Sequence, residues 1–363
     1  MNYKLITILG ARPQFVKAAV LSRIIKKHDE VDEIIIHTGQ HYDTNMSAVF
    51  FEEMDIPKPK YNLAINGLGH GAMTGQMLEK IEVILLDEKP DAVVVYGDTN
   101  STLAGALAAK KLGIKLIHIE AGLRSFNIAM PEEINRILTD RISDLLLCPT
   151  DTALNNLEEE GYKNLPIKVV KAGDIMKDAV SYYSKTSSEK AKVFKSLNLE
   201  KGKFVLATIH RQENTDDLAS LKAIFEALSK ISKEQTVVLP LHPRTKNILK
   251  KNNLNYNIKI IEPVGYFDML ELLKNCSMVV SDSGGLQKEA FFNKKPVIIA
   301  RTETEWVELV TNGFGRIVGA NKDKIHQAFQ DFKNKEFNFS INLYGDAVGE
   351  KMYNEILNLI ETA

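Results

Sequence analysis

Short apolar runs rich in β-branched residues alternate, along the first half of the chain, with segments whose apolar residues recur at helical spacing. This alternation is typical of βαβ units that build a parallel sheet. The first half is therefore expected to form a doubly wound α/β domain. Its strands are expected at residues 5–9, 33–37, 92–96, 115–119 and 145–148, and its amphipathic helices at segments such as 15–27 and 75–86.

The same alternation restarts after a Ser- and Lys-rich helical segment at 181–196, with strands expected at 204–208, 236–239, 258–261, 278–281 and 296–299. We expect a Rossmann-like domain over 1–173 and a second over 174–348, joined by a hinge within 173–180. A last helix in 349–363 is expected to pack back on the first domain. Two facing domains of this kind leave an interdomain cleft, and closing such a cleft excludes water from a reaction.

Composition narrows the class of protein. The length of 363 residues suits two domains, and 44% hydrophobic with 26% charged residues is typical of globular chains. The formal net charge of −1 provides no basic stripe for nucleic acid. Cys148 and Cys276 lie far apart in sequence, which indicates neither a disulfide framework nor a metal motif. The apolar run that ends at Leu9 is too short for a signal peptide or a membrane span, so a cytoplasmic protein with no membrane partner is expected.

Carboxylates follow two of the predicted strands. Asp98 and Glu120 stand where apolar runs break into small and polar residues, and Glu132 follows in the segment Met130-Pro131-Glu132-Glu133. Open α/β sheets build ligand sites at this edge, so the three acids are expected to face one crevice. Two ordinary alternatives remain: Asp98 caps the next helix, and Glu120 pairs with Arg124 or Arg136.

A glycine turn with basic residues follows the first predicted strand. The segment from Gly10 to Lys17 lacks the GxGxxG pattern of dinucleotide-binding domains, so no nicotinamide cofactor is expected. Arg12 and Lys17 could instead hold a phosphate at the start of a helix. The alternative for Lys17 is a solvated helix face.

In the second half, a Gly-rich turn at 281–290 also joins a strand to a helix. Ser283, Gly284 and Gly285 would let backbone amides approach a diphosphate, and Glu289, one turn inside the helix, could accept hydrogen bonds from ribose hydroxyls. The alternative is a tight turn without a ligand.

Two histidines end neighbouring strands of the second half. His210 is followed by Arg211, and His242 stands in Leu241-His242-Pro243-Arg244. Each imidazole could act as acid, base or phosphate partner, or make only a structural hydrogen bond.

Six ordered motifs together resemble the non-hydrolysing UDP-N-acetylglucosamine 2-epimerase family. The resemblance implies the two-domain GT-B fold, an isomerase with a UDP-sugar in the cleft, no metal, no cofactor, and commonly a homodimer. The motifs are Thr38-Gly39-Gln40-His41, Gly97-Asp98-Thr99, His118-Ile119-Glu120-Ala121-Gly122-Leu123-Arg124, Pro131-Glu132-Glu133-Ile134-Asn135-Arg136, His210-Arg211-Gln212-Glu213-Asn214 and residues 281–290.

Departures from the usual family motifs resemble one subgroup. Gln14 stands where the family usually has Glu, and Trp306-Val307 stand where it has Arg-Pro. These changes are similar to the subgroup that epimerises UDP-2,3-diacetamido-2,3-dideoxyglucuronic acid to the manno form. Gln40 and His41 match allosteric positions of bacterial members, whereas His70-Gly71 replace an Arg-Gln pair that helps bind a second UDP-sugar there.

The resemblance implies inversion at C2 by elimination of UDP and its re-addition through a 2-acetamidoglucal. Departure of UDP makes the C2 proton removable, and inversion needs proton-handling groups on two faces. Asp98 and Glu120 are expected to handle protons and Glu132 to be a further acid or base. His210, with Arg12 and the Gly-rich turn, is expected to stabilise the departing diphosphate. Further UDP-sugar contacts are expected from Lys17, Arg136, Arg211, His242 and Glu289.

Three other functions stay open at this point. A retaining glycosyltransferase on the same fold would use the Gly-rich turn and Glu289 similarly, but it would need an acceptor and has little use for the three acids. A catalytically silent nucleotide-sugar sensor would bind without exchange at C2. A hydrolysing epimerase would release the free manno sugar and UDP.

Overall fold

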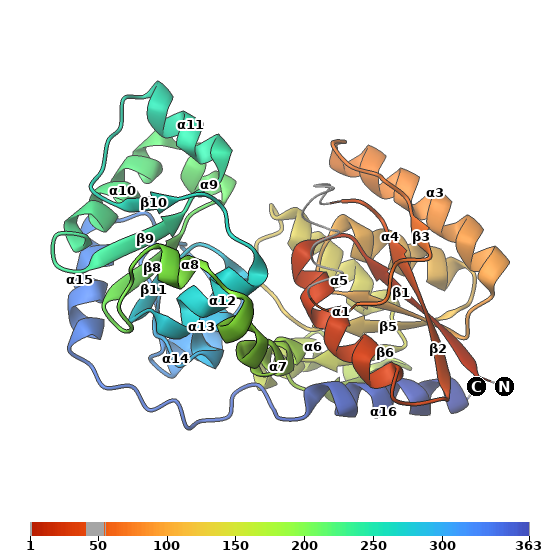
Figure 1. Cartoon of the computed structure of the whole chain (residues 1–363). Coiled ribbons are helices and arrows are strands. Elements are labelled where there is room, and N and C mark those ends of the chain that lie inside the picture. Colours follow the sequence, from red (N-terminus) through yellow and green to blue (C-terminus); the bar gives the residue numbers. More distant parts are fainter. Residues whose placement is uncertain (1, 41–53, 55, 363) are drawn as a thin grey trace. The chain divides into compact units, whose positions relative to one another are not determined.

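The computed structural model describes residues 2–40, 54 and 56–362 (Figure 1). The chain divides into two compact units, the first made of residues 1–179 and 343–363 and the second of residues 180–342. Each unit contains one parallel sheet, so the α/β class with two Rossmann-like domains is confirmed. No helix in the described part of the chain is long and apolar enough to cross a membrane.

The first unit has a seven-stranded sheet in the order β3-β2-β1-β4-β5-β6-β7. The order reverses between β1 and β4, where Leu5 pairs with Ala92. Such a reversal is the point at which doubly wound sheets bind ligands at the carboxyl ends of the strands. The strands are β1 (Tyr3–Leu9), β2 (Val31–His37), β3 (Tyr61–Asn62), β4 (Ala92–Tyr96), β5 (Lys115–Ile119), β6 (Leu145–Cys148) and β7 (Lys168–Lys171).

Helices connect and cover these strands. The last helix of the chain packs against the first, where Gly349 lets the two approach and the Tyr353 hydroxyl donates a 3.0 Å hydrogen bond to Glu30. The helical elements are α1 (Arg12–Ile25), α3 (His70–Glu88), α4 (Asn100–Lys111), α5 (Pro131–Ile142), α6 (Asp151–Glu159), the 3₁₀ turn η1 (Tyr162–Asn164), α16 (Val348–Glu361) and α7 (Ile175–Lys190), which crosses into the second unit.

The second unit repeats the topology with a six-stranded sheet, in the order β10-β9-β8-β11-β12-β13. Its strands are β8 (Phe204–Thr208), β9 (Thr236–Pro240), β10 (Lys259–Ile261), β11 (Met278–Ser281), β12 (Val297–Ile299) and β13 (Gly315–Ile317). Its helices are α8 (Val193–Ser196), α9 (Gln212–Thr215), α10 (Leu218–Ile231), α11 (Pro243–Lys251), α12 (Tyr266–Asn275), α13 (Gly284–Phe292), α14 (Val307–Thr311) and α15 (Lys322–Lys333). The reversal of strand order lies between β8 and β11.

The predicted helical segment 181–196 is confirmed except for a break of two residues. The segment 181–196 is not continuous: α7 ends at Lys190 and α8 begins at Val193. The Asp268 carboxylate accepts hydrogen bonds from the backbone N–H groups of Lys192 and Val193, at 2.8 and 3.0 Å. Because these amides are satisfied by a side chain from α12, the backbone starts a new helix there.

Candidate active site

The first acid-bearing turn follows β4. All five residues of β4 are buried, and the chain then turns at Gly97, whose φ is 62°. Thr99 caps α4 by accepting from the Thr102 N–H at 3.3 Å. The alternative that Asp98 caps this helix is therefore wrong, because Thr99 holds the cap position. The Asp98 carboxylate instead accepts from Arg136 Nη2 at 2.6 Å and Nε at 3.0 Å, and one third of its side chain stays exposed.

The second acid-bearing turn follows the neighbouring strand, β5. Glu120 has a φ of 74°, in the left-handed region that non-glycine residues seldom adopt. Its carboxylate forms an ion pair with Lys17 of α1, and both side chains are largely buried. A Cβ placed on Gly97 would lie 3.2 Å from Glu120 Oε2, so this carboxylate lies against the first turn.

One alternative for these residues is corrected by that ion pair, which gives Glu120 a cationic partner, Lys17, that the sequence did not indicate. Lys17 does not lie on a solvated helix face, since it is 5% exposed. Lys17 therefore places a cation next to the acid that the sequence had assigned to proton handling.

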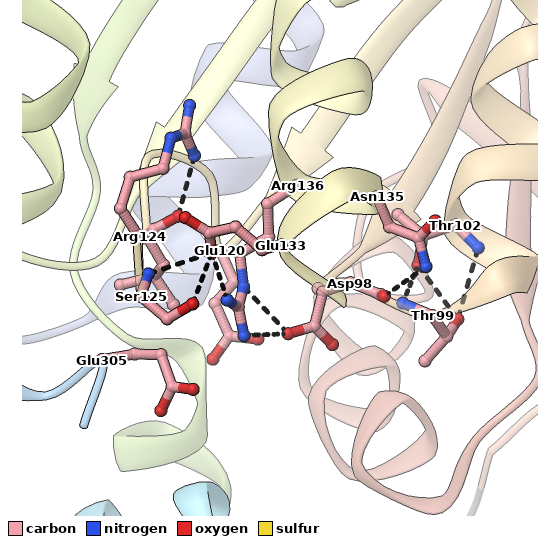
Figure 2. Close-up of polar contacts among 12 residues, drawn as sticks. Asp98, Thr99, Thr102, Glu120, Arg124, Ser125, Glu133, Asn135, Arg136 and Glu305 are labelled. Carbon is pink, nitrogen blue, oxygen red and sulfur yellow. Dashed lines mark hydrogen bonds and ion pairs between the residues drawn. The ribbon is translucent and has the colours of Figure 1, made fainter. Parts of the chain in front are cut away.

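The start of α5 supplies a chain of charges that the sequence did not predict. Figure 2 shows Arg136 between two carboxylates: it donates to Asp98 and, through Nη1 at 2.7 Å, to buried Glu133. Glu133 also accepts from the backbone N–H groups of Ser125 and Phe126, each at 2.9 Å. Arg136 is thus fixed in place for Asp98.

Asn135 is a site residue that the sequence did not predict. Glu132, by contrast, lies apart from the other two acids. The Asn135 amide donates to the Asp98 backbone carbonyl at 2.9 Å (Figure 2). Glu132 is exposed on the first turn of α5, and within the described residues no hydrogen bond or ion pair joins it to Asp98 or Glu120. The adjacent carboxylates Glu132 and Glu133 therefore face different surroundings.

Burial and hydrogen bonding act against each other on Glu133. Burial raises its pKa, but the hydrogen bonds from Ser125, Arg136 and Phe126 outweigh burial and hold the pKa below its usual value. Glu133 is therefore an ionised anchor, and its role is to hold Arg136 and the loop before α5.

Some of the other residues predicted to bind ligands in the first unit make contacts within the protein. Arg12 lies half-buried at the start of α1. The Gln40 side-chain oxygen accepts from the Ser101 N–H at 3.0 Å and from the Ser101 hydroxyl at 2.7 Å, which ties it to α4. His41 lies outside the described residues. His70 Nδ1 lies 3.1 Å from the Asn100 amide.

In the second unit, a buried acid that the sequence did not single out organises the end of β8. Asp282, with no exposed surface, accepts from the backbone N–H groups of His210 and Arg211 at 3.1 and 3.0 Å and from the Asn214 amide at 3.1 Å. His210 Nδ1 lies 3.4 Å from Asp282 Oδ1, and more than half of the His210 side chain is exposed. Asp282 thus orients a titratable ring toward solvent.

The Gly-rich turn after β11 opens α13. Ser283 caps the helix by accepting from the Leu286 N–H at 3.5 Å, and its own N–H donates to Ser281 Oγ at 2.9 Å. Gly284 and Gly285 form the first turn, and Glu289 lies in the same helix. A Cβ on Gly285 would meet no described atom within 4 Å, so the turn faces open space where a ligand could approach.

Arg211 and His242 lie at the starts of two other helices. Arg211 precedes α9, and its guanidinium lies 3.9 Å from Glu213. His242 caps α11, with Nδ1 accepting from the Arg244 N–H at 3.2 Å. His242 therefore makes the structural hydrogen bond that was its alternative interpretation, which leaves Nε2 for any ligand.

Neither cysteine joins this chemistry. Cys148 and Cys276 are buried free thiols, and burial raises the pKa of both, that of Cys276 to about 12. Among residues 2–40, 54 and 56–362, no group of three or more His, Cys, Asp or Glu side chains is arranged to hold a metal ion.

Comparisons with known proteins point to one family. The family model described as UDP-N-acetylglucosamine 2-epimerase matches residues 23–358. A UDP-2,3-diacetamido-2,3-dideoxy-D-glucuronate 2-epimerase of Pseudomonas aeruginosa is 51% identical over 94% of this chain and 96% of its own length. A UDP-N-acetylglucosamine 2-epimerase of Methanocaldococcus jannaschii is 45% identical over 96% of this chain and 97% of its own.

Solved structures agree. The crystal structure of Methanocaldococcus jannaschii UDP-GlcNAc 2-epimerase in complex with UDP-GlcNAc and UDP has a TM-score of 0.88 at 43% identity, covering 99% of this chain and all of its own. The Neisseria meningitidis UDP-GlcNAc 2-epimerase bound to UDP-GlcNAc has a TM-score of 0.87 at 30% identity, covering 99% of this chain and all of its own.

Proposed function

Since the chain belongs to the UDP-N-acetylglucosamine 2-epimerase family, and is therefore an isomerase and not a glycosyltransferase, we propose that its substrate is UDP-2,3-diacetamido-2,3-dideoxyglucuronate. The relative with this activity, at 51% identity over nearly the whole chain, is the observation that carries the proposal. The departures at Gln14 and Trp306 support the same subgroup. UDP-N-acetylglucosamine is the second candidate, because other relatives of high coverage act on it by name.

The acids of the first unit are assigned to proton transfer. One carboxylate accepts the C2 proton, the C2–H electron pair becomes a C1=C2 double bond, and the C1–O electron pair leaves with UDP. Re-addition of UDP then accompanies delivery of a proton to the opposite face of C2. Asp98 and Glu120 are the proposed proton carriers, because they end neighbouring strands and each is held by a cation. Glu132 is proposed as a further acid or base.

The second unit is assigned to UDP. Backbone N–H groups at Ser283, Gly284 and Gly285 would bind the diphosphate at the start of α13, where the helix dipole favours negative charge. Glu289 would accept from the ribose hydroxyls. His210, oriented by Asp282, would stabilise charge that develops on the diphosphate as UDP leaves, an interaction that lowers the barrier because it strengthens in the transition state.

The remaining ligand contacts are assigned from the charge of the side chains. Arg12, Arg211 and the free Nε2 of His242 are proposed as further UDP-sugar contacts, while Lys17 and Arg136 act by holding the two acids. The elimination transfers no electrons to an external acceptor, so no nicotinamide is needed. A reducing cytoplasm is the proposed location, since Cys148 and Cys276 are free thiols.

The test is hydrogen exchange at C2 in D₂O, followed by NMR with each of the two UDP-sugars in separate samples. Asp98→Asn and Glu120→Gln should each lower turnover about 10²-fold or more, because an amide cannot carry the proton. Glu79→Gln, on the exposed face of α3, is the matched control and should keep wild-type turnover.

Near-native turnover in folded Asp98→Asn and Glu120→Gln would refute the carboxylate assignment. Faster epimerisation of UDP-N-acetylglucosamine would replace the proposed sugar with the second candidate. Release of free manno sugar with UDP would indicate the hydrolysing reaction.

A homodimer is proposed from an exposed apolar surface. Ile134 and Leu138 on α5, with Phe126 and Ile128 in the loop before it, are between 43% and 72% exposed. A second copy would remove this surface from water. Sedimentation equilibrium should give a dimer for the native chain and a monomer for Leu138→Lys, whereas a native monomer would exclude the proposal.

A further inference from the structure

A buried ionic network lies beneath the two acid-bearing turns of the first unit. Its centre is His118 on β5 and Asp140 on α5, and neither has any exposed surface. Arg124 joins the network by donating to Asp140 Oδ2 at 2.7 Å and, at 2.7 and 2.8 Å, to both oxygens of Glu160. Charges buried this deeply are costly unless every one is paired, so the arrangement needs an explanation beyond packing.

Hydrogen-bond geometry supports a charged His118. Its Nε2 lies 2.7 Å from the Gly97 carbonyl oxygen, which can only accept, so Nε2 carries a hydrogen. Its Nδ1 lies 2.7 Å from Asp140 Oδ1. Asp140 Oδ2 already accepts from the Gly122 N–H at 3.1 Å and from Arg124, as a carboxylate does. With the hydrogen between Oδ1 and Nδ1 carried by Nδ1, His118 is an imidazolium paired with a carboxylate.

The surrounding groups agree with this assignment. Burial raises the pKa of Asp140, but hydrogen bonding and charge from His118 and Arg124 outweigh burial and hold the pKa below its usual range. The other titratable neighbours, Cys148 and Tyr162, have pKa values raised by burial and are neutral. Two cations, His118 and Arg124, thus balance two anions, Asp140 and Glu160.

The backbone groups that this network holds are the two that flank the candidate acids. Gly97 precedes Asp98, and Gly122 closes the turn that contains Glu120. That second turn is strained, because Glu120 itself adopts a φ of 74°. The N–H groups of Glu120 and Ala121 also donate to the Leu147 carbonyl, so the turn is fixed from two sides.

We propose that His118 and Asp140 are positioning residues for epimerisation: an imidazolium–aspartate pair that fixes the turns of Asp98 and Glu120 relative to each other. The proposal rests on the function assigned above to these two acids. Because the pair contacts the two turns only through the backbone of Gly97 and Gly122, its loss should shift the acids without removing substrate contacts. A displacement of about 1 Å can slow a reaction about 10²-fold.

The charge state is tested on the unmodified full-length chain by ¹⁵N NMR of histidine side chains at pH 8.5, with His118→Gln used to assign the signals. We expect two protonated ring nitrogens for His118 where exposed histidines show one. A neutral His118 ring would overturn the proposal even if no variant folds.

The positioning role is tested by kcat and KM of three variants: His118→Gln, Asp140→Asn and Asp140→Glu. Asp140→Glu keeps the charge but adds one methylene to a site with no exposed surface, so its fold is checked by circular dichroism. Each should lower kcat between about 10-fold and 10²-fold with KM within about 2-fold of wild type. His28→Gln, a partly exposed histidine, is the control and should change neither constant.

The outcomes separate the two proposals. Wild-type kcat in folded Asp140→Glu, together with inactive Asp98→Asn and Glu120→Gln, would overturn the positioning role alone. Active Asp98→Asn and Glu120→Gln would refute the assigned function itself.

Discussion

Glu132 and Glu133 show how much of a single residue's role can be predicted from sequence. The motif Pro131-Glu132-Glu133 predicts a carboxylate at a helix start and favours Glu132 as the acid or base. The structure buries Glu133 instead, because the loop before α5 folds back and directs the Ser125 and Phe126 N–H groups at it. No local pattern distinguishes the two neighbours, since the deciding contacts come from the tertiary course of that loop.

Glu133→Gln is expected to lower stability at pH 7. An amide cannot accept from both backbone N–H groups and pair with Arg136, and a buried donor left unsatisfied costs about 1–3 kcal/mol. The pKa of Glu133 is lowered in the folded chain, so its contribution is complete above the unfolded value of about 4.3 and is lost as the pH falls through the folded value.

The measurement is the Tm of Glu133→Gln and of its exposed neighbour variant Glu132→Gln between pH 3 and pH 7. Glu132→Gln should stay within about 0.5 kcal/mol of wild type. Wild type should lose stability on acidification more steeply than Glu133→Gln. Equal melting of the two variants at pH 7 would contradict the anchoring role of Glu133.

At the scale of elements, one side chain joins a turn, a strand and a helix. The Gln14 side-chain oxygen accepts from the Gly10 and Ala11 N–H groups at 2.7 and 2.9 Å. Its amide nitrogen donates to the Tyr96 carbonyl at 2.7 Å and to Thr99 at the cap of α4. Gln14 therefore links the β1–α1 turn to the end of β4, across the reversal of strand order.

Gln14→Glu is expected to destabilise the first unit, and more so as the pH rises. A carboxylate has no hydrogen to donate to the Tyr96 carbonyl, so the folded chain favours the protonated acid. The pKa of the introduced carboxyl would thus be raised in the folded state, and its stabilising contribution is lost as the pH rises through that value. The Tm at pH 8 relative to pH 5 should fall further than for Gln76→Glu, the same change at an exposed site of α3. Equal shifts in both variants would contradict the assigned hydrogen bonds.

The sequence predicted best the elements that are buried along their whole length. Central strands such as β4 and β8 are buried throughout and read as continuous apolar runs, so their bounds were found. The edge strands β3, β7 and β13 were missed, because they are short and partly exposed and contain residues such as Lys168 and Arg316. The acids at strand ends were predictable from position. Their partners Lys17 and Asn135, and the Asp282 carboxylate that holds His210, depend on which segments the topology brings together.

On the scale of the whole molecule, two units with the same strand order contain different chemistry. The first contains the paired acids, and the second contains the buried Asp282 and the Gly-rich turn of α13. The restart of the βα pattern made this duplication predictable from sequence. The separation of roles gives a testable consequence, because UDP binding should depend on the second unit and proton exchange on the first.

Gly285→Ala is expected to weaken UDP binding while leaving the free protein as stable as wild type. The added Cβ meets no described atom within 4 Å, and alanine suits a helix, so only a ligand at the turn would encounter it. UDP at about 100 times its Kd should stabilise wild type by about 2.7 kcal/mol, which raises the Tm by several degrees. Asp98→Asn should keep that shift although it no longer epimerises, whereas Gly285→Ala should lose most of it. If Gly285→Ala retains the full shift, the diphosphate is bound elsewhere, and a shift lost in Asp98→Asn would show that the acids of the first unit contribute to UDP affinity.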